Sequence, residues 1–143
     1  MKGMQLLLFL PCAAFVLLAY LTFEVMIFRW SCRLARVPRP TLLRSVSIVL
    51  VVILAVSVAE GILGSAITEA YILGGYPLGE AGFVAFFLGL PVHMAVCSAI
   101  HARMLRRPLG EGLSVWLVEK TIKLGLISVG AGLVALLILA NRA

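Results

Sequence analysis

Three ionisable side chains lie inside long apolar stretches of the chain, where they could carry chemistry. Glu24, Glu60 and His93 each have uncharged, largely apolar neighbours on both sides. A carboxylate at the centre of a membrane span costs about 2.5–3.5 kcal/mol unless it is paired, protonated or reached by water. Carboxylates and imidazoles can take up and release protons, so these residues predict a proton or cation site within a membrane.

Glu60 also has a structural interpretation, which depends on where its helix begins. If the helix begins at Thr41, Glu60 lies about 28 Å along it, because an α-helix rises about 1.5 Å per residue. Glu60 is then close to the outer membrane surface, where Lys2 or Arg142 could neutralise it. A helix that begins near Val46 buries Glu60 instead. The surface position is the favoured interpretation.

Glu24 has a structural interpretation of a different kind. It is expected about one turn inside its span, at the depth of Arg44, Lys120 and Lys123 on neighbouring helices. Opposite charges at one depth of a membrane can neutralise each other. An interhelical ion pair that fixes the helices is therefore favoured over chemistry at Glu24.

His93 follows Pro91 by two residues and has several possible roles. It could bond the backbone carbonyl that the proline leaves free, relay protons or bind haem. His101 lies about 12 Å further along the same predicted helix, so the two histidines cannot ligate one iron. No haem, metal or other cofactor is therefore expected.

The sequence contains none of the common catalytic motifs. It has no Ser-His-Asp set, no glycine-rich phosphate loop and no HExxH motif, and Asp is missing entirely. The three cysteines, Cys12, Cys32 and Cys97, show no CxxC spacing that would indicate a zinc or dithiol site. An enzyme is accordingly the least expected class of protein.

The composition indicates a membrane protein in which helices position these side chains. Hydrophobic residues make up 63% of the 143 residues and charged residues only 13%, whereas soluble domains are about a quarter charged. Four apolar stretches cover residues 6–27, 46–67, 83–100 and 124–140. Each approaches the roughly 20 residues that span a bilayer, and none alternates as a barrel strand does. We therefore expect an all-α protein with a single four-helix transmembrane domain.

The basic residues predict how the helices are threaded. The loops at residues 28–45 and 101–112 are rich in arginine, whereas the loop at residues 68–82 has no Lys or Arg. Basic loops stay in the cytoplasm, so both termini are expected outside, in a bacterial inner membrane. The net charge of +6 is concentrated in these loops, which argues against nucleic-acid binding. The arginines expected to contact anionic lipid headgroups are Arg33, Arg36, Arg39, Arg44, Arg103, Arg106 and Arg107.

This threading groups the helices into two like-oriented hairpins, each closed by a basic loop. Cys32 and Cys97 are each followed by several arginines, a proline and a Ser-Val pair, in the same order. The order suggests a parallel internal repeat. Chance matches are common in sequences of such low complexity, so duplication and coincidence both stay open.

Small residues at every fourth position predict close helix packing. They are Ser57, Gly61 and Ser65 in the second stretch and Ser128 and Gly132 in the fourth. Such ridges let helix backbones approach each other in lipid, either within one chain or between subunits. Because four helices of this size bury little of one another, the chain is expected to form a homo-oligomer or to join a membrane complex.

Two functions follow from these observations. The first is a non-catalytic accessory, assembly or scaffold subunit of a membrane complex, since each intramembrane polar group has a plausible structural partner. The alternative is an oligomeric channel or proton-coupled small-solute carrier that uses Glu60 with Glu24 or His93.

Overall fold

The protein consists of four long α-helices joined by short connections. The computed structural model describes the backbone of residues 2–140 and the side chains of residues 11–140. The helices are α1 (Lys2–Leu34), α2 (Leu42–Gly74), α3 (Leu78–Leu105) and α4 (Leu109–Ala140). All four are long and apolar enough to cross a membrane. The predicted class, an all-α membrane protein, is confirmed.

The helices extend beyond the apolar stretches, so the connections are shorter than the predicted loops. They comprise residues 35–41, 75–77 and 106–108. Hydropathy identifies the segment of a helix that can lie in lipid, whereas the hydrogen-bonded helix itself continues through the polar residues that flank this segment. Capping residues define both ends of α2. At its start, the Thr41 hydroxyl accepts a hydrogen bond from the backbone N–H of Arg44, and at its end Gly75 adopts a left-handed φ of 68°. Because α4 is unbroken from Leu109, its polar first turns are not a separate surface helix.

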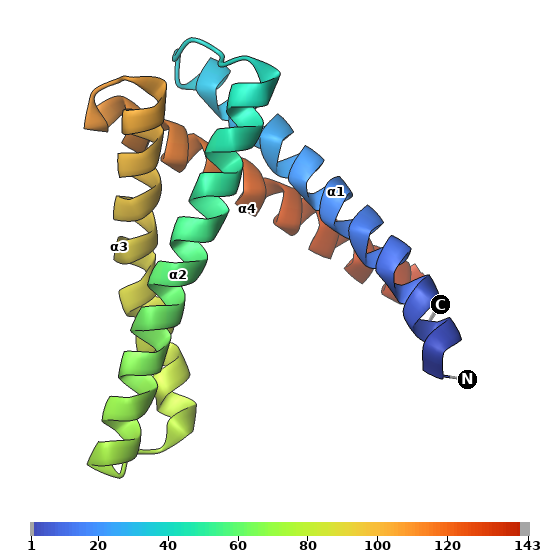
Figure 1. Ribbon diagram of the computed structural model, residues 1–143, viewed down its shortest axis with the longest axis vertical. Helices are drawn as coiled ribbons and strands as arrows, with labels where there is room; N and C mark the ends of the chain where they lie inside the picture. Colours follow the sequence, from blue (N-terminus) through green and yellow to red (C-terminus); the bar gives the residue numbers. More distant parts are fainter. Residues whose placement is uncertain (1, 141–143) are drawn as a thin grey trace.

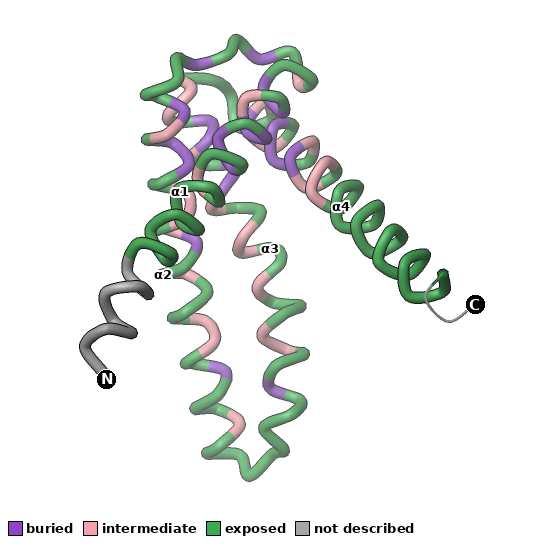
Figure 2. Tube along the Cα trace, turned by 90° about the vertical axis from the view of Figure 1, so that its right-hand side faces the viewer, coloured by how far each residue is buried: buried purple, intermediate pink, exposed green. Residues whose placement is uncertain are grey.

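The four helices form a fork, as Figure 1 shows. α2 and α3 run side by side as a long antiparallel pair, closed by the turn at residues 75–77. The two other connections lie together at the opposite end, which we name the arginine-loop end. From there α1 and α4 lean away from the α2–α3 pair, and their far ends separate from each other (Figure 2). The most extensive contacts are those of α3 with α2 and with α4.

The buried core occupies the arginine-loop end (Figure 2). Its largest fully buried apolar side chains are Phe28, Ile48 and Val115, from three different helices. By contrast, residues 11–20 of α1 and 124–140 of α4 are all exposed within the chain. In a membrane, lipid or another protein must cover these two apolar arms.

A glycine brings α3 and α4 into close contact within this core. A Cβ atom at Gly112 would lie 2.8 Å from the backbone nitrogen of Ala102 and closer still to the carbonyl oxygen of Ser98. Neither backbone atom can move without shifting α3. The α3–α4 packing therefore requires glycine at this position.

α1 and α3 end in the same way, which bears on the predicted repeat. Arg36 and Arg106 both follow a helix end with a left-handed φ, of 58° and 56°. Beyond them, the N–H of Val37 bonds the carbonyl of Cys32, and the N–H of Arg107 bonds that of Ala102, each at 2.8 Å. These matching caps align Cys32 with Ala102, a different register from the one that the cysteines suggested.

Candidate functional site

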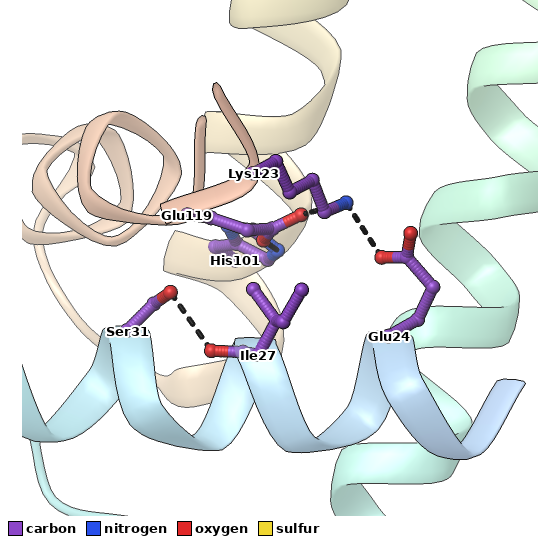
Figure 3. Close-up of polar contacts among 6 residues, drawn as sticks. All are labelled: Glu24, Ile27, Ser31, His101, Glu119 and Lys123. Carbon is purple, nitrogen blue, oxygen red and sulfur yellow. Dashed lines mark hydrogen bonds and ion pairs between the residues drawn. The ribbon is translucent and has the colours of Figure 1, made fainter. Parts of the chain in front are cut away.

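A half-buried lysine connects two carboxylates where α1 crosses α4 (Figure 3). Lys123 Nζ lies 2.6 Å from Glu24 Oε2 and 2.8 Å from Glu119 Oε1. The two glutamate side chains are each only 11% exposed. The interhelical ion pair predicted for Glu24 is thus confirmed, with Lys123 as its partner. Glu119 and Lys123 can share this face of α4 because residues four apart are neighbours on a helix.

His101 extends this cluster toward α3. Its Nε2 lies 4.0 Å from Glu119 Oε2, and its side chain is 2% exposed. The imidazole packs against Phe28 with ring centroids 5.1 Å apart. We name Glu24, Glu119 and Lys123 the lysine-bridged cluster. Its charges are mutually paired and nearly buried, an arrangement that depends on every member being present.

A second polar contact joins the two helices of the antiparallel pair. His93 Nδ1 of α3 lies 2.8 Å from Glu60 Oε1 of α2. The Glu60 side chain is 49% exposed and that of His93 is 23% exposed. The Glu60–His93 pair is therefore open on one side, unlike the lysine-bridged cluster.

Sequence reasoning missed the Glu60–His93 pair. α2 does begin at Leu42, the start that favoured a surface position, but it continues to Gly74, so Glu60 lies in the middle of the helix. The side chains of Lys2 and Arg142, its expected partners, lie outside the described residues. A usable signal was present: Glu60 and His93 are nearly equidistant in sequence from Tyr76 in the turn. In an antiparallel pair with a short turn, such residues lie at one depth.

A small cavity of about 260 Å³ connects the two polar groups. A polar space of this size can hold water. The ionisable side chains that line it, tyrosine aside, are Glu24, Glu60, Glu119, Lys120, Lys123, His93 and His101. The fold thus gathers the three residues that the sequence singled out, Glu24, Glu60 and His93, around one polar space. His101, Glu119 and two lysines join them there.

The charges around this cavity do not balance when both histidines are neutral. Three carboxylates and two ammonium groups line it, which leaves a net charge of −1. An unbalanced charge is costly in a membrane interior. One bound proton or one monovalent cation makes the set neutral. The Glu60–His93 pair suits the proton, because an imidazole beside a carboxylate can hold it between two acceptors.

A large cavity of about 640 Å³ begins where the small one ends. It lies between α2, α3 and α4, and its walls are mostly apolar. Glu60, His93 and Lys120 line both cavities and so mark the boundary between them. Lys120 was not among the site residues predicted from the sequence.

The small residues predicted to pack helices do not do so within the chain. Ser57, Gly61, Ser65, Ser128 and Gly132 are exposed. A Cβ atom at Gly61 or Gly132 would meet no atom within 4 Å. An internal contact is therefore not their role in this fold, and a contact between subunits stays a prediction.

The arginines predicted to contact lipid are exposed at the arginine-loop end. This is true of all seven, from Arg33 to Arg107. One of them also has a structural contact: the Arg44 guanidinium donates to the carbonyl oxygen of Met104 near the end of α3. A second, Arg107, has its Nε 3.8 Å from Glu111 Oε2, and the other five present their charge at one end of the molecule.

Comparison of the chain with protein-family models, curated proteins and solved structures gave no match. Among the described residues, no group of three or more His, Cys, Asp or Glu side chains is placed to hold a metal ion. The function is therefore argued from the geometry of the two cavities and their charged side chains.

Proposed function

We propose that this integral membrane protein is a proton-coupled carrier of a small solute, with the Glu60–His93 pair as its proton site. The observation that carries the proposal is the 2.8 Å contact between His93 Nδ1 and Glu60 Oε1 at the boundary of the two cavities. A proton held there is accessible from a polar space on one side and from an apolar space on the other.

The charge balance suggests how the proton and a solute are coupled. With one proton on the pair, the small cavity is neutral; after its release, the cavity has a net charge of −1. A cation can then replace the proton at the same electrostatic cost. Two ligands that neutralise one site exclude each other, which is the simplest form of exchange. Glu24 contributes to the wall of the small cavity but is already paired with Lys123.

An accessory or scaffold subunit is the second candidate, because the two arms have no cover within the chain. Residues 124–140 of α4 are all exposed, and many are large and apolar. A partner protein or a second copy could pack against them. In that case the two polar contacts serve only to hold the helices at a fixed depth.

The proposed threading keeps the arginine-loop end in the cytoplasm of a bacterial inner membrane, beside anionic lipid headgroups, and both termini outside. Single cysteines introduced into a cysteine-free variant test this. Residues 35–39 should react with an impermeant thiol reagent only from the cytoplasmic side, and residues 75–77 only from outside. The opposite pattern would overturn the threading.

Proton movement into liposomes tests the carrier directly. We expect the wild-type protein to carry protons across the membrane when a pH gradient is applied, and Glu60→Gln to abolish this flux. Glu69→Gln is the matched control, because Glu69 is an exposed acid on the same helix, away from both cavities. If the wild type moves no protons with or without candidate solutes, or if Glu60→Gln behaves as the wild type does, the proposal fails.

A further inference from the structure

We propose that the large cavity binds apolar molecules that carry a single positive charge, with Glu60 as their counter-ion. This inference rests on the proposed function, since it takes the Glu60–His93 pair as the proton site, and it names the class of solute. Four observations support it: the lining of the cavity, its opening, its charge and the groups around Glu60.

The lining of the large cavity suits an apolar body. Leu63 of α2, Leu90 of α3 and Leu117 of α4 face it from three sides. Its volume of about 640 Å³ lies within the range of roughly 300–1,000 Å³ that is typical of small-molecule sites. Phe86 and Trp116 add aromatic rings, whose faces attract cations.

The cavity is partly open, and α4 leaves the other helices just beyond it. Leu124 is the last residue of α4 that lines it, and every residue from there to Ala140 is exposed. Figure 1 shows α4 diverging from the α2–α3 pair beyond this region. In a membrane the side where α4 diverges faces lipid, so a molecule that partitions into the bilayer can enter laterally.

The charges select a cation over an anion. Glu24 and Glu119, two of the three acids around the small cavity, are matched in number by Lys120 and Lys123. Glu60 is the remaining acid; its hydrogen-bond partner is His93, and Lys120 also lines both cavities. When the proton leaves, the carboxylates and ammonium groups around the two cavities together have a net charge of −1. A monovalent cation with an apolar body complements both this charge and the apolar lining of the large cavity.

Ionisable groups from the three other helices line the small cavity together with Glu60. His93 and His101 come from α3, Tyr20 and Glu24 from α1, and Glu119, Lys120 and Lys123 from α4. Of these groups, His93 makes a direct contact with Glu60, at 2.8 Å. A proton on the pair removes the charge that attracts the solute. Binding of the cation should therefore weaken as the pH falls, and each binding event should release up to one proton.

Two probes of the same shape and opposite charge test this inference. Binding of tetraphenylphosphonium and of tetraphenylborate to the full-length protein in lipid nanodiscs is measured by calorimetry, with empty nanodiscs subtracted. We expect tetraphenylphosphonium to bind at least tenfold more tightly than tetraphenylborate. Its affinity should fall at least threefold for each unit of decrease in pH through the range where the pair protonates.

Charge variants should shift the affinity for tetraphenylphosphonium in opposite directions. Glu60→Gln should lower it at least tenfold, whereas Lys120→Gln should raise it about threefold, because a positive charge leaves the cavity wall. Glu69→Gln should leave it unchanged. A rise with Glu60→Gln or a loss with Lys120→Gln would overturn the inference.

Two glycines allow the cavity to be filled without a steric clash. Gly64 and Gly89 line it, and a Cβ atom at either would meet no atom within 4 Å. Gly64→Leu and Gly89→Leu should therefore fold as the wild type does and lower the affinity for tetraphenylphosphonium at least fivefold. Unchanged affinity in both folded variants would show that the probe binds elsewhere, which contradicts the inference.

The outcomes separate this inference from the proposed function. If protons move in liposomes but tetraphenylphosphonium binds no more tightly than tetraphenylborate, the solute class is wrong and the proton site stands. If tetraphenylphosphonium binds at Glu60 without proton release, the cation site stands and the proton coupling fails.

Discussion

The molecule contains two polar groups that face one small cavity and yet differ in how they are built. In the lysine-bridged cluster, Lys123 bonds Glu24 and Glu119, and the two glutamates are each 11% exposed. In the Glu60–His93 pair, the glutamate is 49% exposed and only one partner accompanies it. A paired, buried charge is expensive to disturb, whereas a half-open one can exchange its partner. We propose that the first group holds the helices and that the second carries the function.

The largest effect is expected from removing the ammonium group shared by two acids. Lys123→Met leaves Glu24 and Glu119 buried without a counter-charge and should destabilise the fold by about 3–5 kcal/mol. Thermal unfolding in detergent measures this. Lys120→Met is the matched control, since Lys120 takes no part in the two hydrogen bonds, and it should cost clearly less than Lys123→Met does. Equal losses in both variants would mean that the cluster does not pin α1 to α4.

A smaller loss is expected from separating α3 and α4. Gly112→Ala places a methyl group against the backbone at Ser98 and Ala102 and should cost about 1–3 kcal/mol, as overpacking typically does. Gly110→Ala is the control, because a Cβ atom there meets nothing within 4 Å. If Gly112→Ala unfolds at the wild-type temperature, the close packing at the arginine-loop end is incorrect.

The smallest effect on the single chain is expected on the exposed face of α2. Gly61→Ala adds a methyl group in open space, so the free energy of unfolding should change by no more than about 1 kcal/mol, toward higher stability. If the small residues join subunits, as predicted, the same variant should shift the oligomer toward monomer in light scattering. An unchanged oligomeric state would remove this face from the subunit contact.

The sequence was most informative where a property belongs to one helix alone. Hydropathy along the chain was sufficient to predict the four helices, and the depth of Glu24 in its span pointed to Arg44, Lys120 and Lys123, of which the structure shows Lys123. The lateral arrangement of the helices was not predictable in the same way. Each helix is apolar around most of its circumference, so no stripe marks the face that packs against a neighbour.

The candidate site shows the same limit. Glu60 meets His93 because α2 lies against α3. Both line a cavity because α4 leaves the other helices after Lys123. Neither is a property of a sequence motif. The small-residue ridge of α2 shows the converse, since a Cβ atom at Gly61 would meet no atom within 4 Å although the motif is typical of helix packing.

The central claim is that the lysine-bridged cluster stabilises the fold and the Glu60–His93 pair carries the proton. Two matched variants test it most directly. Glu24→Gln and Glu60→Gln each remove one carboxylate charge, and both stability and proton flux are measured on the same purified protein. We predict that Glu24→Gln loses about 1.5–3 kcal/mol of stability but that its folded fraction carries protons, whereas Glu60→Gln unfolds as the wild type does and carries none. A reversed pattern, or flux that follows stability in both variants, would contradict the account.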